Sequence, residues 1–567
     1  MATTQFLACD GQQGMRHNSG NGADIGLDVL PEYDIGHPDV AISGEVSRYL
    51  PVTREESHGL ATSLVCSDCH ATSTSSSAMK DAAGRPIGQF DLWQSTMKAN
   101  SYRDPFFRAV MSAEVHRNPE AQEAIEQTCL RCHAPAGTVA AERSGTPMSL
   151  EAATVQGTVG AHAADGVNCV ACHAIMDVNL GTEASYSAGW QLDADKRVFG
   201  PHASPFTMPM QNRIGFTPVA SDHISSSELC ATCHTLHTAT FLPEGGIAEE
   251  KFPEQTPYLE WKNSIFASGD TEQTCQDCHM PTTDVDGNVI STKLAHKPDG
   301  GDFPPVNARS PYGRHLLVGG NIWVPQIFKN ERATLGPVGS DAAIDATIVA
   351  PLDQLQNRTA RVSIEEPVLN AGRASFAVAV ENLAGHKFPT AYPSRRAWLH
   401  IKVMDAGGAT LWESGAYTDA GDIVGDDGGT FPHAQTLNDA SQVQVYEAVL
   451  GDVDGNQTVA LLRAHQYLKD NRLLPKGWRA DHEDIGDTQS VGVDGDPTFV
   501  GGGDTTLVDA VFEGTPTSIE VELLYQSLGN RWLRDLFDVP TADVQAFKQM
   551  WERIDRRPAV VSSVSYP

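Results

Sequence analysis

The stretch Asp165-Gly-Val-Asn-Cys-Val-Ala-Cys-His173 contains the pattern that decides how this chain folds. In it, two cysteines are separated by two residues, and a histidine directly follows the second cysteine. The same Cys-x-x-Cys-His pattern occurs five times, at residues 66–70, 129–133, 169–173, 230–234 and 275–279, and it uses ten of the eleven cysteines. A unit repeated in this form indicates a group that needs two thiols and one imidazole at every copy.

Haem c meets this requirement. Its two vinyl groups form thioether bonds with two thiols at this spacing, and the adjacent histidine reaches the iron as the proximal axial ligand. We therefore predict five haem c groups. Their attachment residues are Cys66, Cys69, Cys129, Cys132, Cys169, Cys172, Cys230, Cys233, Cys275 and Cys278, and their proximal ligands are His70, His133, His173, His234 and His279.

Zinc knuckles and disulfides are the alternative uses of paired cysteines. A zinc site combines two knuckles, so five copies leave one unpaired, and zinc does not require a histidine after every second cysteine. A disulfide framework suits short secreted chains, whereas this chain has 567 residues. Calcium is also not expected, because the loop-like stretch that starts at Asp284 has Ala295 where a calcium loop has its bidentate acid. Haem c accounts for the pattern best.

Cys9 is the cysteine outside the motifs. Because haem is attached covalently on the exported side of a membrane, we expect the mature chain in the periplasm, at the outer-membrane surface or outside the cell. The eight residues before Cys9 cannot hold the apolar stretch of a signal peptide, so we expect that the natural N-terminus differs. Phe6-Leu-Ala-Cys9 is similar to a lipoprotein processing site, which would anchor the chain by a lipid; a lone thiol in an N-terminal tail is the alternative.

Charge and hydropathy narrow the choice of partners. A formal net charge of −32 excludes the basic surface that nucleic-acid binding needs and disfavours adsorption to anionic lipid. The acidic surface suits a solvated protein or one that meets basic partners. There is no run of 18 apolar residues, so we expect no transmembrane span.

The sequence pattern changes near residue 341, and this change predicts an α+β organisation. We expect an N-terminal tail at 1–50, a pentahaem domain of short helices and loops packed on haems at 51–340, an antiparallel β-sandwich-like domain at 341–535, and a C-terminal helix and tail at 536–567. Helical patches are predicted at 90–100, 106–116, 119–133 and 341–357. Apolar residues alternate at 376–380, 399–403 and 519–525, which predicts strands. Thr541 caps a predicted helix that presents Val544, Phe547, Trp551 and Ile554 on one face.

Several segments together resemble exported multihaem cytochromes related to cytochrome c-554, in which haem-packing motifs precede a β-rich tail. The segments are Asp91-Leu-Trp-Gln-Ser-Thr-Met-Lys-Ala99, Asp104-Pro-Phe106, 165–173, 226–234, Tyr258-Leu-Glu-Trp261, 275–281, His315-Leu-Leu-Val-Gly-Gly-Asn321, Gly385-His-Lys-Phe-Pro-Thr390 and Asp470-Asn-Arg-Leu-Leu-Pro-Lys-Gly477. The resemblance covers about residues 60–400 and continues more thinly to the end. It implies an electron carrier or the haem scaffold of a reductase.

The sixth ligand of each iron separates these two roles, because a bis-histidine haem is saturated whereas an open haem can bind a substrate. Twenty histidines, of which five are proximal, leave fifteen that can ligate. We predict His223, His315 and His386 as distal ligands; His386 would bring its ligand from the β domain. Further candidates are His58, His116, His162, His202, His296 and Met97. We expect His400, His433, His465 and His482 at the surface.

Relatives often carry a histidine ligand in the Trp-x-x-Ser segment, where this chain has Met97 and Lys98. Either Met97 ligates, or the ligand comes from elsewhere, or one iron is open. The leading hypothesis is electron relay through five haems to other redox proteins, with other cytochromes as partners, or along a homo-oligomer or filament. The alternative is a reductase or oxidase of a small nitrogen or sulfur compound at one open haem. A third is a structural role, in which the β domain anchors the carrier to a cell-surface assembly.

Overall fold

The structure is a computed structural model that describes residues 49–567, so the lipid-anchor hypothesis for Cys9 lies outside the described residues. The chain divides into two compact units, each assembled from three segments. Unit 1 comprises the described residues up to 232 together with 274–351 and 541–554, and unit 2 comprises 233–273, 352–540 and 555–567. Within 49–567, the longest apolar stretches of helix fall short of what a membrane crossing requires.

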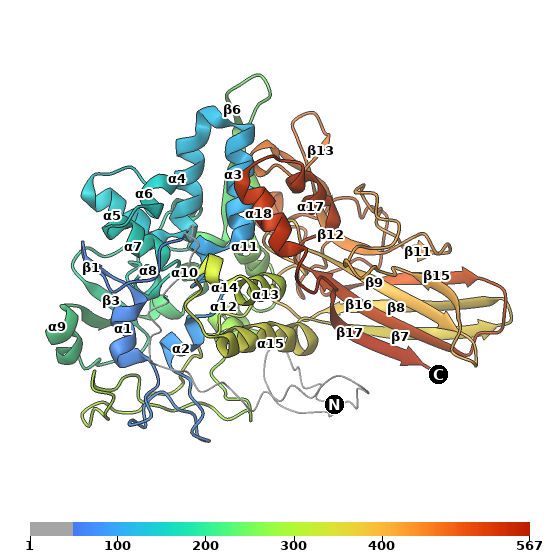
Figure 1. Ribbon diagram of the computed structural model, residues 1–567. Helices are drawn as coiled ribbons and strands as arrows, with labels where there is room; N and C mark the ends of the chain where they lie inside the picture. Colours follow the sequence, from blue (N-terminus) through green and yellow to red (C-terminus); the bar gives the residue numbers. More distant parts are fainter. Residues whose placement is uncertain (1–48) are drawn as a thin grey trace. The chain divides into compact units, whose positions relative to one another are not determined.

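Unit 1 is built from short helices joined by loops and two small sheets (Figure 1). Its elements are β1 Glu56–Ser57, β2 Leu60–Ala61, α1 Ser63–His70, α2 Gln89–Trp93, α3 Pro105–Arg117, α4 Gln122–His133, α5 Pro135–Ser144, α6 Leu150–Thr154, α7 Thr158–Ala164, α8 Cys169–His173, β3 Arg197–Gly200, α9 Met208–Ile214, β4 Thr217–Ala220, α12 Cys275–His279, α13 Trp323–Asn330, α14 Arg332–Leu335 and α18 Ala542–Trp551. Helices α10 Ser227–His234 and α15 Asp341–Arg358 pass from one unit into the other.

Local sequence explains where the longer helices begin. Asp104 precedes α3, and its carboxylate accepts hydrogen bonds from the amides of Phe106 (2.9 Å) and Phe107 (3.4 Å), while Pro105 occupies the first helical position. Thr541 caps α18 in the predicted way, accepting a bond from the amide of Val544 at 3.3 Å. The predicted helices at 106–116 and 341–357 are confirmed, whereas 90–100 is helical only as far as Trp93.

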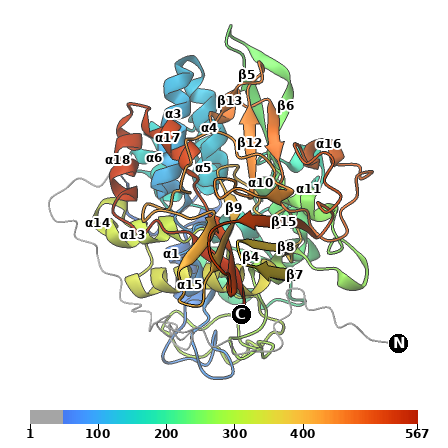
Figure 2. The same ribbon diagram turned by 90° about the vertical axis from the view of Figure 1, so that its right-hand side faces the viewer.

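Helix α18 follows the β-rich segment in sequence but packs on α3 (Figures 1 and 2). The hydroxyl of Thr541 is hydrogen-bonded to that of Ser112 at 2.7 Å, and the rings of Phe547 and Phe106 lie 5.5 Å apart. The apolar face predicted from Val544 and its neighbours is therefore covered by the haem-motif unit, which the chain re-enters for this one helix.

Unit 2 contains two larger sheets and a long hairpin. Its elements are β5 Leu236–Phe241, β6 Ile247–Gln255, α11 Pro257–Lys262, β7 Ala360–Asn370, β8 Arg373–Asn382, β9 Arg396–Met404, β10 Thr410–Ser414, β11 Thr436–Leu437, β12 Val445–Gly451, β13 Gln457–Thr458, β14 Gln466–Asp470, α16 Ile485–Thr488, β15 Gly503–Val511, β16 Ser518–Gln526, α17 Asn530–Phe537 and β17 Ala559–Tyr566.

One sheet runs in the order β13-β12-β9-β16-β17, with β10 paired to β9 and β14 to β12, and the other runs β11-β15-β8-β7. Nearly all neighbours are antiparallel; β11 and β15 are parallel. The period-two segments predicted as strands are β8, β9 and β16. In β8 the alternating residues Phe376, Val378 and Val380 are buried. The amide of Val362 in β7 donates to Ser562 Oγ in β17 at 3.2 Å, which joins the two sheets. The predicted α+β fold with a β-rich C-terminal part is confirmed.

The end of the chain differs from the tail that we expected after the C-terminal helix. Residues Ala559–Tyr566 form β17, which pairs along β16 with Ile519 opposite Tyr566 and Tyr525 opposite Ala559. Alternation of apolar residues such as Val561 with serines gives this segment one face for the core, and the edge of β16 supplies the hydrogen-bond partners that the extended backbone needs.

Two histidines expected at the surface are buried instead. His400 on β9 stands directly opposite Glu522 on β16, and its ring nitrogens lie 3.0 Å from Glu522 and 2.8 Å from Glu413. His433 is also enclosed: its Nε2 lies 2.9 Å from the carboxylate of Asp496. The prediction of a surface position was wrong for both residues, because a carboxylate from another segment of the chain forms a hydrogen bond with each imidazole. The local sequence around the histidine does not show that partner.

Candidate haem-binding site

All five Cys-x-x-Cys-His motifs lie on helices that end at the motif histidine. These helices are α1, α4, α8, α10 and α12. One helical turn brings the two cysteines to the same side, and the histidine follows at the point where the chain leaves the helix. All ten motif cysteines are partly accessible. The motifs therefore present two thiols and one imidazole together.

Backbone carbonyl groups orient the motif histidines, which are the predicted proximal ligands. In four of them, Nδ1 lies within hydrogen-bond distance of a main-chain oxygen: His70 with Leu294 (2.9 Å), His133 with Ser101 (3.1 Å), His173 with Phe199 (2.7 Å) and His279 with Val318 (2.6 Å). A carbonyl can only accept, so Nδ1 carries the proton and Nε2 carries the lone pair. This is the second contact by which proteins orient a metal-ligating histidine. The residues fit haem c.

Burial favours the neutral, ligating form of these imidazoles. It lowers the pKa of His133 to about 4, against the opposing effect of the hydrogen bond to the Ser101 carbonyl, and the Lys98 ammonium lowers it further. Burial also lowers the pKa of His70 and of His173. The ring of Phe107 is stacked on that of His133, with centroids 3.6 Å apart and planes 6° apart, which fixes the ring plane as well.

The fold brings motifs that are distant in sequence into contact. The side chain of Cys66 in the first motif lies beside that of Cys169 in the third. In the same way Cys230 of the fourth motif contacts Cys275 of the fifth. The amide of Cys275 also donates to Ser227 Oγ, just before the fourth motif, at 3.1 Å. The attachment points of motifs one and three, and of motifs four and five, are therefore adjacent.

His315 faces the proximal histidine of the third motif. The ring centroids of His315 and His173 are 6.3 Å apart and their planes differ by 20°. Two imidazoles that each bind one metal ion at about 2 Å, from opposite sides, have centroids about 6 Å apart. His315 Nδ1 lies 3.1 Å from the carbonyl of Gly313, so both rings keep Nε2 as the nitrogen with the lone pair. Burial lowers the pKa of His315 to about 3, and the electrostatic effect of His173 lowers it further.

The other two predicted distal ligands have different surroundings. His386 lies in unit 2, and its Nδ1 is 2.8 Å from the carbonyl of Lys387, which again assigns the lone pair to Nε2. His223 is held at both nitrogens: Nδ1 is 2.7 Å from Ser221 Oγ and Nε2 is 2.9 Å from the carbonyl of Ile175. In this arrangement His223 Nε2 donates a proton, so ligation by His223 requires its ring to leave Ile175.

The further candidates are scattered. His296 lies between two carbonyl oxygens, those of Lys297 (2.6 Å) and Ala71 (2.7 Å), beside the first motif. His162 is buried in α7, with Nε2 3.2 Å from Ser57 Oγ. His58 and His116 are exposed, and His202 and Met97 are half-buried. The structure thus pairs His315 with a motif histidine and leaves these candidates without an equally regular arrangement.

A set of charged side chains around His386 was not among the residues predicted from the sequence. Glu260, Lys387, Asp470 and Arg472 form a buried ion network in unit 2. Each belongs to a segment that resembles the cytochrome c-554 group, namely 258–261, 385–390 and 470–477. Charged residues inside the family-like segments were the signal that could have identified them.

Residues 65–174 match the family model described as cytochrome c554 and c-prime. A search of the curated proteins finds no match. Among solved structures, the chain is similar to a penta-heme cytochrome c552 from Thermochromatium tepidum, with 18% identity, a TM-score of 0.48, and coverage of 90% of this chain and 100% of that chain.

Proposed function

We propose that the protein is a multihaem c-type cytochrome that relays electrons through five covalently bound haems; its residues 65–174 match the cytochrome c554 and c-prime family model. We place this relay in the periplasm or at the cell surface, where covalent haem attachment takes place. Each haem, when bound, supplies a one-electron redox centre. The partners that this role needs are other redox proteins, such as further cytochromes, or further copies of the chain.

The observation that carries the proposal is the pairing of His315 with His173. Their ring centroids have a separation that suits two ligands of one iron, their planes are 20° apart, and both have Nδ1 at a backbone carbonyl. An iron held by two imidazoles has no free position for a substrate, so such a centre passes electrons and does not transform a ligand. The adjacent attachment cysteines, Cys66 with Cys169 and Cys230 with Cys275, support short steps between centres.

The decisive experiment uses the purified holoprotein. Electron paramagnetic resonance of the oxidised protein should show low-spin ferric signals, and carbon monoxide should leave the Soret band of the reduced protein almost unchanged. A high-spin component that accounts for about one haem in five, together with cyanide-sensitive turnover of nitrite or hydroxylamine, would contradict the proposal and support a reductase.

A further inference from the structure

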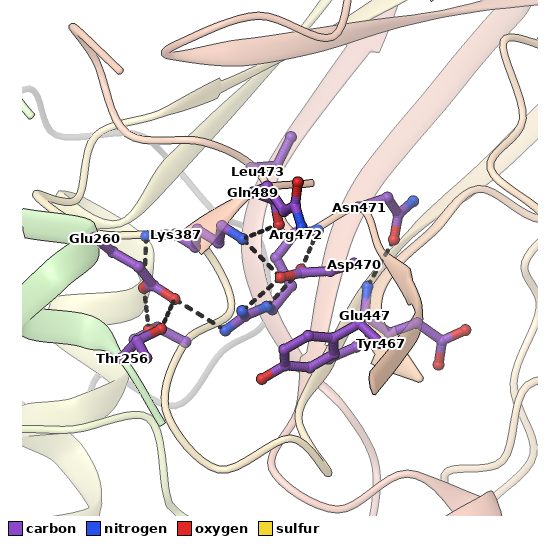
Figure 3. Close-up of polar contacts among 12 residues, drawn as sticks. Thr256, Glu260, Lys387, Glu447, Tyr467, Asp470, Asn471, Arg472, Leu473 and Gln489 are labelled. Carbon is purple, nitrogen blue, oxygen red and sulfur yellow. Dashed lines mark hydrogen bonds and ion pairs between the residues drawn. The ribbon is translucent and has the colours of Figure 1, made fainter. Parts of the chain in front are cut away.

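Three family-like segments meet in the interior of unit 2. Glu260 comes from α11, Lys387 from the loop after β8, and Asp470 with Arg472 from the end of β14 and the residues that follow (Figure 3). The side chains of Glu260 and Lys387 are fully buried, and those of Asp470 and Arg472 are 1% and 5% exposed. The network contains two cations and two anions, so it is neutral.

The charges pair closely. Lys387 Nζ lies 2.6 Å from Asp470 Oδ2 and donates also to the carbonyl of Gln489 at 3.2 Å. Arg472 donates from two nitrogens to the two oxygens of Asp470, both at 2.7 Å, and a third nitrogen lies 3.2 Å from Glu260 Oε1. Arg472 therefore links Asp470 to Glu260, in the bidentate manner that makes arginine–carboxylate geometry rigid.

Glu260 also holds the loop that carries His386. Its Oε2 accepts hydrogen bonds from the amide of Lys387 (3.1 Å) and from the hydroxyl of Thr390 (2.5 Å), which are the residues on the C-terminal side of His386. Asn382 Nδ2 donates to the carbonyl of His386 at 2.9 Å, in the same peptide group as the Lys387 amide. The peptide group between His386 and Lys387 is thus bonded at both its oxygen and its nitrogen to buried or partly buried side chains of unit 2.

Stability alone gives a weak reason for such a network, because buried ion pairs often stabilise a fold no more than apolar residues of the same volume would. Their better-attested use is to specify one geometry. The group whose geometry is specified here is His386, since Lys387 is its neighbour and Lys387, Thr390 and Arg472 all bond to Glu260 or to its partner Asp470.

We propose that Glu260, Lys387, Asp470 and Arg472 are positioning residues that hold the His386 loop so that His386 ligates a haem iron. The inference rests on the proposed function, in which His386 is a distal ligand. The apparent affinity of His386 for the iron falls with the fraction of time that its loop spends in the binding geometry. A loop that is held in that geometry therefore keeps the ligand on the iron. Loosening the network should therefore free the iron for a diffusible ligand.

The test measures carbon monoxide binding and the spin state of the holoprotein. In Glu260→Gln and Asp470→Asn, we expect carbon monoxide to bind at up to one haem per chain, at a rate raised about tenfold for a loss of about 1.4 kcal/mol in ligand positioning. Thr390→Val removes one hydrogen bond to Glu260 and keeps every charge. It should lower the low-spin signal of one haem and raise carbon monoxide binding at that haem, as in the two charge variants. Glu260→Asp should restore part of the native signal.

Asp426→Asn is the matched control. Asp426 is 1% exposed and lies 2.6 Å from Arg396 in unit 2, as Asp470 lies 2.6 Å from Lys387, but its pair does not involve the segment 385–390. Asp426→Asn should leave spin state and carbon monoxide binding at the wild-type level even if it lowers stability. An equal response in Asp426→Asn would reduce the network to a general stability effect and overturn the proposal.

His386→Ala separates failure of the inference from failure of the ligand assignment. A high-spin haem in His386→Ala, with wild-type spectra and carbon monoxide rates in Glu260→Gln, Asp470→Asn and Thr390→Val, would show that the network does not position the ligand. Unchanged low-spin signals in His386→Ala itself would show that His386 is not a ligand. If the two charge variants fail to fold, Thr390→Val decides between these outcomes.

Discussion

The imidazoles of His173 and His315 face each other with centroids 6.3 Å apart and planes 20° apart, although 141 residues separate them in sequence. His173 is placed by the end of α8 and by the carbonyl of Phe199, and His315 by the loop before α13 and the carbonyl of Gly313. Both rings therefore have Nε2 as the nitrogen with the lone pair. The relationship gives the third motif a specific partner, which the spacing of the motif does not reveal.

Replacement of His315 tests this pairing. In His315→Ala we expect one haem to become high-spin and to bind carbon monoxide when reduced, because His173 would hold its iron from one side only. Covalent attachment should be unchanged, since Cys169 and Cys172 are intact. His465→Ala, at a partly exposed position that we did not predict as a ligand, is the control and should keep the wild-type spectrum. Low-spin signals of wild-type intensity in His315→Ala would refute the assignment.

Haem stoichiometry tests the five motifs. The intact mass of the purified protein should exceed that of the polypeptide by five haem groups, and the haem should survive acid-acetone extraction because thioether bonds hold it. A double replacement, Cys129→Ala with Cys132→Ala, should lower the number by one and leave four. A wild-type mass increase of fewer than five haems would contradict the proposed count.

His400 should give the β unit a pH-dependent stability. Burial lowers the pKa of His400, but the hydrogen bonds to Glu522 and Glu413 raise it more, so its pKa in the folded protein lies above the ordinary value of 6.5. Its contribution is complete below pH 6.5 and is lost as the pH rises through the folded pKa. His400→Gln should lower the free energy of unfolding by about 1 kcal/mol at pH 5.5 and by less at pH 9.

Denaturant unfolding at the two pH values measures this effect. Glu413→Gln is a companion variant that removes one of the two carboxylates 2.8 Å from the His400 ring, and it should reproduce part of the pH dependence. An equal loss of stability at pH 5.5 and pH 9 in His400→Gln would mean that packing, and not charge, is what the residue contributes.

The buried cluster of His433, Asp496 and Asp504 should not bind a divalent cation, although its ligand atoms lie within 4.8 Å of one another. The amides of Gln444 and Asn471 both donate to His433 Nδ1 at 3.0 Å, and backbone contacts to their oxygens fix both orientations. Nδ1 is therefore the acceptor, so Nε2 carries the proton and donates it to Asp496. Zinc or calcium should leave the melting temperature unchanged; saturable stabilisation that His433→Asn abolishes would contradict this.

The sequence also anticipated several elements outside the motifs. Asp104, Pro105 and Thr541 determined helix starts because capping depends on residues within one turn. Alternation predicted β8, β9 and β16 because the side-chain period of a strand is local as well. The tail at 559–566 was not anticipated as a strand, since its partner edge on β16 comes from folding.

What the sequence by itself determined is the chemistry of the chain: five units of two thiols and one imidazole, each written within five residues, and the α+β division. Only the tertiary structure decided which groups face those units. His315 opposite His173, Cys66 beside Cys169, and Glu260 bonded to the loop of His386 all join residues more than 100 positions apart. The physical reason is that covalent attachment and helix capping depend on residues that are neighbours along the chain. The second ligand of a metal and the partner of a buried charge are selected by packing, because any segment that brings the right atom to the site can supply them.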